Sequence, residues 1–312
     1  MAAPFDLAHA PPIGVPERLA PGLRVVTAPN AGPMTFTGTR SYIVGDGEVA
    51  VIDPGPDDSA HREALVAAVA GERVMAVLVT HAHLDHSGGA REFARQVGAV
   101  VVGHGDPEGG RSPTMARLAA AGGLGGGEGI DPSFRPHFAI GDGFTIKGPD
   151  WTLTALATPG HTADHLSFAW EEAGALFSGD LVMGWATTVI SPPDGDLAAF
   201  RASLGRLRAR DDRVYFPGHG APVAAPGALI DHILAHRQGR EDAILAGLAA
   251  GPQGLGALFA RVYHDVAAEL WPAAARNLLA HLIDLEERGL VTADLPPGPA
   301  ATFRLAGSIE QP

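Results

Sequence analysis

Four residues that can bind a metal ion lie within six consecutive positions, in the segment His81-Ala-His83-Leu-Asp85-His86. Imidazole nitrogen and carboxylate oxygen are ligands that zinc and other borderline divalent ions accept. In an extended turn His81 and His83 point the same way, whereas Asp85 and His86 project into a neighbouring position as a helix begins. The spacing therefore predicts one loop that serves two adjacent metal ions.

Three later segments share one form, in which glycine directly precedes a residue that can bind a metal. They are Thr158-Pro-Gly-His161, Phe177-Ser-Gly-Asp180 and Phe216-Pro-Gly-His219. Each follows a predicted strand, and glycine allows a sharp turn and a close approach at that point. Because sites gather at the carboxyl ends of strands, we expect these three side chains to meet the first loop.

Short apolar runs alternate with helical patterns through most of the chain, and this order is typical of a layered α/β protein. The dipeptide Asp46-Gly47 between two such runs indicates a hairpin. Strands are predicted at residues 40–45, 48–53, 73–80, 99–103, 151–157, 166–170, 175–177 and 214–216, and helices at residues 61–70, 87–96 and 197–209.

The remaining segments differ in composition and define the predicted domains. Residues 1–22 predict an extended N-terminal arm, and residues 23–228 predict the catalytic domain. Within that domain, residues 105–137 hold nine glycines and predict a mobile surface excursion rather than a lid. Residues 229–312 predict three helices followed by a two-stranded ribbon, which is the outline of a winged-helix module.

Charge and cysteine content exclude several kinds of function. The formal net charge of the 312 residues is −13, and an acidic surface repels phosphate backbones. Because the chain has no cysteine, disulfides, thiolate zinc sites and cysteine nucleophiles are excluded. Neither a signal peptide nor a membrane span is predicted, so the expected compartment is the cytoplasm.

The predicted winged-helix module is itself acidic, with six arginines against ten acidic residues from Leu229 onward. A module that grips DNA needs a basic face. DNA is therefore not an expected partner. We expect the module to cover one side of the active cleft or to mediate a homodimer.

The ordered set of metal-binding residues resembles the metallo-β-lactamase superfamily of hydrolases, and within it the β-lactamase-like protein 2 group, which has a C-terminal winged helix. The similarity runs from about Arg40 to Thr302, interrupted at residues 105–137. It implies a four-layer αββα sandwich followed by a small winged-helix-like domain. Further segments that carry it are Pro159–His165, Phe177–Asp180, Thr187–Val189, Pro217–Gly220, His236-Arg237 with Arg240-Glu241, and Asn277–Leu282.

The resemblance implies two divalent metal ions. His81, His83 and His161 would hold the first ion, Asp85, His86 and His219 the second, and Asp180 would bridge them. Zinc is the first expectation, with manganese or iron as alternatives, because nitrogen and oxygen ligands suit all three. Such a pair supplies a hydroxide at neutral pH. Asp85 would orient that nucleophile and move a proton to the leaving group.

Three other residues have weaker assignments. His165 is expected to pack beside the ligands or to be an ordinary core histidine. Thr188 would line the substrate pocket or end a strand. His236, together with its neighbour Arg237, would reach the cleft and bind an anionic group, or lie on a solvated helix face.

The reaction class that follows is metal-assisted hydrolysis, and its substrate divides into two hypotheses. The first is attack on a small ester, thioester or lactone, which the net charge of −13 favours. The second is phosphodiester cleavage of single-stranded RNA, which the resemblance implies. A mononuclear iron dioxygenase, which would leave Asp85, His86 and His219 idle, and a non-catalytic protein are the remaining alternatives.

Overall fold

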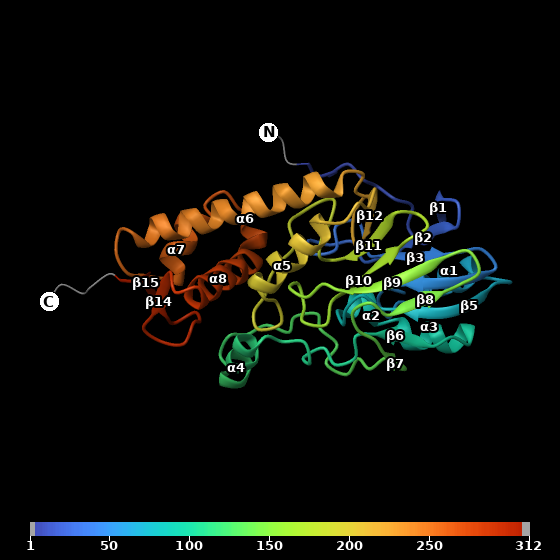
Figure 1. Ribbon diagram of the computed structural model, residues 1–312, viewed down its shortest axis with the longest axis horizontal. Coiled ribbons are helices and arrows are strands. Elements are labelled where there is room, and N and C mark those ends of the chain that lie inside the picture. Colours follow the sequence, from blue (N-terminus) through green and yellow to red (C-terminus); the bar gives the residue numbers. More distant parts are fainter. Residues whose placement is uncertain (1–3, 308–312) are drawn as a thin grey trace.

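The structure, a computed structural model, describes residues 4–307 and contains two large β-sheets (Figure 1). The strands of the first sheet follow the sequence order β1 (Glu17–Ala20), β2 (Leu23–Thr27), β3 (Arg40–Val44), β4 (Glu48–Ile52), β5 (Arg73–Leu78), β6 (Val101–Gly103) and β7 (Phe138–Ala139). The strands of the second sheet lie in the order β12 (Val214–Pro217), β11 (Ala175–Gly179), β10 (Leu166–Trp170), β9 (Thr152–Ala157) and β8 (Thr145–Lys147).

The central strands are apolar on both faces because both faces are covered. In β3, Tyr42 packs between the two sheets, and the next residue, Ile43, packs against the helices outside. In β10, Phe168 faces the other sheet and Ala169 faces the outer helices. Side chains alternate between the faces of a strand, so a strand between two covered faces has a continuous apolar sequence.

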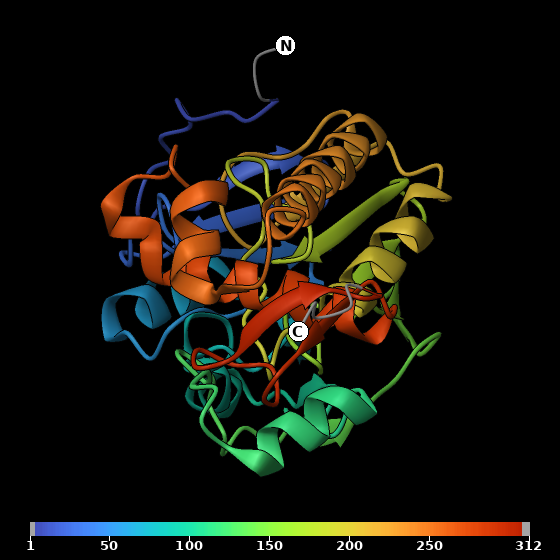
Figure 2. The ribbon, with the colours of Figure 1, turned by 90° about the vertical axis from the view of Figure 1, so that its left-hand side faces the viewer.

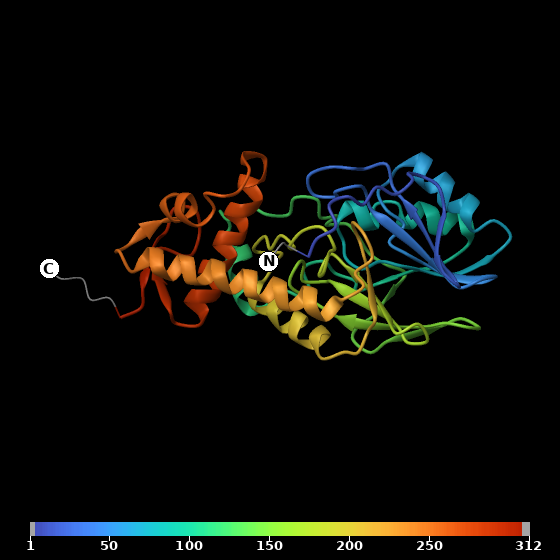
Figure 3. The same cartoon turned by 90° about the horizontal axis from the view of Figure 1, so that it is seen from above.

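Helices cover the outer face of each sheet. Helices α1 (Ser59–Ala68) and α3 (Ala90–Val97) contribute Leu65 and Phe93 to the cluster outside the first sheet. Helices α5 (Leu197–Arg208) and α6 (Pro226–Leu248) contribute Phe200 and Ile230 to the cluster outside the second. The four layers are visible from above (Figure 3), and the predicted αββα sandwich is confirmed.

A smaller unit follows the sandwich (Figure 2). It contains α7 (Leu255–Val262), the 3-10 turn η1 (Ala268–Leu270), α8 (Trp271–Glu287), and a three-stranded sheet of β13 (Gln253–Gly254), β15 (Thr302–Leu305) and β14 (Val291–Ala293). The predicted winged-helix-like arrangement is confirmed. No helix within residues 4–307 combines the length and apolar composition of a membrane span.

Helix α6 joins the two units without a break. Its first half places Leu229 and Ile233 in the cluster outside the second sheet. Its second half places Ile244 and Leu248 in the core of the C-terminal unit. The boundary expected near residue 228 therefore falls in the first turn of a helix that belongs to both cores.

Two segments are more ordered than the sequence predicted. Residues 17–20 of the expected arm form edge strand β1, because they pair with β2; residues 1–3 lie outside the described part. The glycine-rich segment 105–137 is not a free excursion. Its helix α4 (Pro113–Ala121) and Leu124 bury apolar side chains against Leu279 and Ile283 of α8.

Candidate metal centre

The loop after β5 carries four of the predicted side chains to one end of the first sheet. β4 and β5 are parallel neighbours, so the segments that follow them meet at the same edge. The backbone nitrogen of Ala82, in the middle of this loop, donates a 2.9 Å hydrogen bond to Oδ2 of Asp164. The loop and the short helix α2 (Leu84–Ser87) present His81, His83, Asp85 and His86.

His81, His83 and His161 form the first group. Nδ1 of His83 lies 2.8 Å from Nε2 of His81 and 3.1 Å from Nε2 of His161. Nitrogens bound to one zinc ion at roughly 2.0–2.1 Å in tetrahedral geometry lie about 3.3 Å apart. The spacing of these three nitrogens is therefore close to that of ligands around one ion.

Asp85, His86 and His219 form a second group beside the first. Nε2 of His219 lies 3.1 Å from Oδ2 of Asp85 and 3.2 Å from Nε2 of His86. Nε2 of His86 lies 3.4 Å from the same Asp85 oxygen. In each group the donor atoms lie within 4.8 Å of one another, a spacing that fits a metal ion.

Asp180 lies between the two groups. Its Oδ2 is 3.4 Å from Nε2 of His219 and 3.7 Å from Nε2 of His161, while its Oδ1 is 3.5 Å from Nε2 of His86. Oδ1 is buried and accepts no hydrogen bond. An unsatisfied buried carboxylate oxygen among imidazole nitrogens fits a site for cations. All seven side chains that the sequence singled out are thus close together.

Glycine is required beside this centre for two different reasons. Gly179 has a φ of +50°, and a Cβ there would lie 2.6 Å from Nε2 of His165. At Gly218 a Cβ would lie 2.5 Å from Oδ1 of Asp180 and 2.6 Å from Cε1 of His86. The expected role of glycine in these turns is confirmed at both positions.

Asp53, which the sequence analysis did not single out, orients two of the imidazoles. Its Oδ2 accepts hydrogen bonds from Nδ1 of His86 at 2.9 Å and from Oγ1 of Thr80 at 2.7 Å. Because the Thr80 proton is used in this way, Oγ1 of Thr80 accepts from Nδ1 of His81, 2.9 Å away. In its neutral form each of the two imidazoles therefore has its proton on Nδ1 and its lone pair on Nε2, which faces the centre. The feature of the sequence that could have identified Asp53 is its position directly after β4, a strand that is parallel to β5.

The two weaker predictions that fall near Asp180 concern His165 and Thr188. Nε2 of His165 accepts a 3.1 Å hydrogen bond from the backbone nitrogen of Asp180, and burial lowers the pKa of His165 to about 3. Oγ1 of Thr188 donates at 2.6 Å to the backbone oxygen of Asp180. Thr188 is fully buried, so it holds the Asp180 backbone and does not line the pocket.

His236 lies on α6 and is not among the described residues that line the pocket. Its neighbour Arg237 is buried rather than solvated. One guanidinium nitrogen of Arg237 donates to the backbone oxygen of Thr188, and another donates at 2.9 Å to Oδ1 of Asn277.

Burial keeps the first group neutral. It lowers the pKa of His83 to about 3, and it also lowers the pKa values of His81 and His161. Neutral imidazole is the form that binds a metal ion. Two neutral imidazoles that face each other with lone pairs repel, so a cation between them would stabilise this arrangement.

In the second group the pKa values of the two imidazoles are raised, which favours their protonated forms. Burial alone would lower the pKa values of His86 and His219, but the nearby carboxylates, Asp85 and Asp180 among them, raise them, to about 9 for His219. Burial also opposes ionisation of Asp180, yet the two imidazoles lower its pKa. These carboxylates require positive charge beside them, which a divalent ion would supply in place of protons.

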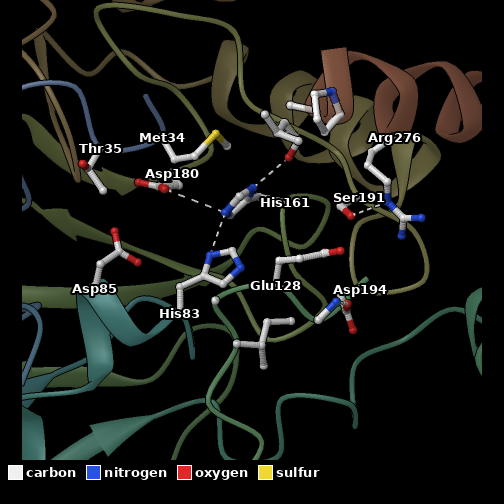
Figure 4. Close-up of a pocket in the computed structure, with 16 residues that line it drawn as sticks. Met34, Thr35, His83, Asp85, Glu128, His161, Asp180, Ser191, Asp194 and Arg276 are labelled. Carbon is white, nitrogen blue, oxygen red and sulfur yellow. Dashed lines mark hydrogen bonds and ion pairs between the residues drawn. The ribbon is translucent and has the colours of Figure 1, made fainter. Parts of the chain in front are cut away.

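A pocket of about 460 Å³ opens onto the centre (Figure 4). His83, Asp85, His161 and Asp180 form its inner end. The remaining lining comes from four separate parts of the chain, namely residues 34–35, the segment 127–130 of the glycine-rich region, residues within 189–194, and residues within 272–276 of α8.

The glycine-rich segment forms part of this pocket because several hydrogen bonds hold it in place. The backbone nitrogen of Leu84 donates to the oxygen of Gly129 at 2.7 Å, and the nitrogen of Gly127 donates to Oδ2 of Asp194, also at 2.7 Å. Arg276 of α8 donates to Oγ of Ser191 at 2.8 Å and to the backbone oxygens of Leu124 and Pro192.

Comparison with known proteins agrees with this geometry. Residues 34–219 match the sequence profile of the metallo-β-lactamase superfamily. The chain belongs to this superfamily. Residues 255–294 match the β-lactamase-associated winged helix domain. The predicted resemblance is confirmed for both units.

The relatives of the chain include proteins named as thioesterases and proteins named as β-lactamase-like protein 2 homologs. The chain is 33% identical over 240 residues to an atrochrysone carboxyl ACP thioesterase of Aspergillus fumigatus, covering 74% of this chain and just under two thirds (66%) of that protein. It is 30% identical over 274 residues to a β-lactamase-like protein 2 homolog of Drosophila melanogaster, covering 83% of this chain and 86% of that one.

A solved structure extends the likeness to both units. A metallo-β-lactamase family protein from Thermus thermophilus superposes with a TM-score of 0.73 at 29% identity, covering 92% of this chain and 100% of that one. Together, the superfamily, the thioesterase relatives and the histidine–aspartate cluster identify the chain as a metal-dependent hydrolase.

Proposed function

We propose that this metallo-β-lactamase-fold hydrolase uses two metal ions. The position of Asp180 carries the proposal, since its carboxylate lies within 3.7 Å of ligand nitrogens from both groups. Zinc is the first expectation, with manganese or iron as alternatives. The first ion would be held by His81, His83 and His161, the second by Asp85, His86 and His219, and Asp180 would contact both.

A pair of bound divalent ions supplies an ionised water at neutral pH and polarises the carbonyl of the substrate. Asp53 and Thr80 keep the two imidazoles in the tautomer that ligation requires. The Asp85 side chain is 26% exposed and lines the pocket, so it can contact both the nucleophile and the substrate. We assign to the Asp85 carboxylate the orientation of the nucleophile; it would accept a proton from the attacking oxygen and pass that proton to the leaving group.

We propose a small ester, thioester or lactone as the substrate. Met34, Ile130 and Val189 give the pocket apolar walls, Glu128 adds negative charge, and the charge of Asp194 is paired with that of Arg111. The single cationic side chain of the described lining, Arg276, already donates to three protein oxygens. A polyanionic RNA strand needs cations along its path. The thioesterase relative also supports a thioester.

Metal analysis and substrate assays test these proposals together. The purified chain should hold two equivalents of metal and should hydrolyse members of a panel of acyl thioesters, aryl esters and lactones. His81→Ala and His219→Ala should each abolish hydrolysis, whereas His264→Ala, at an exposed histidine far along the chain, should not. Cleavage of a labelled single-stranded RNA that His81→Ala abolishes, without any esterase activity, would overturn the proposed substrate.

The same metal analysis separates the dinuclear hydrolase from a mononuclear dioxygenase. The second group would be idle in a dioxygenase, yet its donor atoms, like those of the first group, lie within 4.8 Å of one another. One iron per chain, oxygen consumption with substrate, and full activity of His219→Ala would reject the dinuclear proposal.

A further inference from the structure

Besides the part of α8 that lines the pocket, the C-terminal unit is bonded to the three-residue segment Thr188-Val189-Ile190, which itself contacts the metal centre. We infer that Arg237 and Asn277 are positioning residues that set the geometry of Asp180 and His161 through this segment. The inference rests on the proposed metal-binding function of those two side chains. Arg237 and Asn277 belong to the segments His236-Arg237 and Asn277–Leu282, for which the proposed chemistry of the metal centre gives no role.

The segment holds two candidate ligands by separate hydrogen bonds. Oγ1 of Thr188 donates to the backbone oxygens of Asp180 at 2.6 Å and of Leu181 at 3.1 Å. The backbone oxygen of Val189 lies 2.9 Å from Nδ1 of His161 and accepts its proton. This second bond leaves Nε2 of His161 unprotonated and directed at the centre, so a displacement of Val189 would rotate or release that imidazole.

The C-terminal unit fixes both ends of the segment. Arg237 of α6 donates to the backbone oxygen of Thr188, and Asn277 of α8 accepts from the backbone nitrogen of Ile190 at 3.0 Å. Arg237 also donates to Oδ1 of Asn277 at 2.9 Å, which joins the two helices at this point. The path from α6 and α8 to the centre therefore consists of direct hydrogen bonds at every step.

The burial of Arg237 is costly for a residue that only packs. The residue is 2% exposed, and no carboxylate of residues 4–307 lies within ion-pair distance of its guanidinium. A buried cation without a counterion lowers stability unless its hydrogen bonds compensate. Its hydrogen bonds are made to a backbone oxygen of the segment and to the side chain that holds the other end of the segment.

Arg240, on the same helix, provides a matched comparison. Its guanidinium donates to the backbone oxygen of Val262 and to Asp265 at 3.1 Å and 3.2 Å, so its contacts stay within the C-terminal unit. A substitution at Arg240 loosens that unit without touching residues 188–190. If the role of Arg237 were purely structural, its substitution, like that of Arg240, would lower stability without changing the metal affinity.

The test uses the full chain loaded with Co²⁺, whose visible absorption reports ligand geometry. Arg237→Met, Asn277→Ala and Thr188→Val should each change the Co²⁺ spectrum and weaken metal binding, measured by chelator competition, by about 10–100-fold. With a substrate found for the wild type, kcat should fall by a similar factor and KM should change little. Arg237→Lys, which keeps a cationic donor, should recover part of the affinity and the wild-type spectrum.

Arg240→Met should lower the melting temperature but keep the Co²⁺ spectrum and the metal affinity of the wild type. The inference fails if Arg237→Met and Thr188→Val fold and retain that spectrum and affinity. Thr188→Val changes one hydroxyl at nearly constant volume, so it remains informative if Arg237→Met does not fold. A wild type that binds no metal would instead refute the proposed function itself, so the two failures are distinguishable.

Discussion

Nδ1 of His86 donates a 2.9 Å hydrogen bond to Oδ2 of Asp53. Among the described residues 4–307, Asp53 forms no hydrogen bond or ion pair with any of the other six proposed ligands. The bond joins the end of β4 to helix α2. It determines which nitrogen of His86 faces the centre, because an imidazole with Nδ1 protonated has its lone pair on Nε2.

Asp53→Asn should reduce metal affinity and kcat/KM by about 10–100-fold, because an amide can offer a proton to Nδ1 of His86 and stabilise the wrong tautomer. Chelator competition and metal content after dialysis measure the first effect. Asp58→Asn, five residues later at the N-cap of α1, is the control, since asparagine caps helices as well as aspartate does. Wild-type retention of both ions by Asp53→Asn would contradict the role of this bond.

Gly218→Ala should reduce activity by at least about tenfold, because the new Cβ would lie 2.5 Å from Oδ1 of Asp180 and 2.6 Å from Cε1 of His86. Steady-state kinetics and metal content check this result. Gly205→Ala in α5, where no heavy atom lies within 4 Å of the added carbon, should keep full activity and gain about 0.5–1 kcal/mol of stability. Equal activity of the two variants would refute the close approach at Gly218.

Removal of metal should lower the melting temperature, because the buried carboxylates of the centre lose their counterions. Each ion present at 100 times its Kd stabilises the folded chain by about 2.7 kcal/mol, which corresponds to roughly 4 °C in a chain of 312 residues. Thermal melts before and after dialysis against a chelator measure the shift, and added zinc should reverse it. An unchanged melting temperature in protein proven free of metal would count against two tightly held ions.

His61 should make the apoprotein sensitive to acid. Burial lowers the pKa of this histidine from 6.5 to about 4, and its Nε2 lies 2.8 Å from Oγ of Ser41. A depressed pKa in the folded state stabilises the chain above pH 6.5, and this contribution is lost as the pH falls through 4. The difference between the pKa of His61 in the unfolded chain and in the folded chain corresponds to about 3 kcal/mol of unfolding free energy.

Melting temperatures of the apoprotein between pH 7 and pH 4 test this expectation. His61→Gln should be less stable at pH 7 but should lose less stability on acidification than the wild type. His264→Gln, at an exposed histidine, should follow the wild-type profile. Parallel profiles for the wild type and His61→Gln would show that His61 does not control the acid sensitivity.

The sequence singled out seven side chains that lie close together in the structure because each segment that carries them follows a strand. A strand that ends in Pro-Gly-His or Ser-Gly-Asp specifies both the sheet edge and the turn. Asp180 and His219 follow β11 and β12, which are parallel neighbours, so their meeting follows from topology alone. The alternation of apolar residues likewise predicted the layers, since burial on both faces leaves its pattern in each strand.

Contacts between distant segments could not be predicted in the same way. The glycines of residues 105–137 indicated mobility, but Met115, Leu118 and Leu124 find apolar partners on α8, more than 150 residues later. Arg237 looked like a residue of a solvated helix face, because local spacing does not define how α6 is rotated against residues 188–190. Asp53 was a single carboxylate after a strand, and its partners became apparent only when β4 and β5 were paired.

Helix α6 has a consequence for how this protein can be divided. One continuous helix supplies Ile230 to one core and Ile244 to the other. Severing the gene near codon 228 would therefore give two fragments with exposed apolar surfaces, not two autonomous modules. An exchange of the C-terminal unit with that of a related protein would therefore have to include all of α6 and the residues of α5 that pack against it.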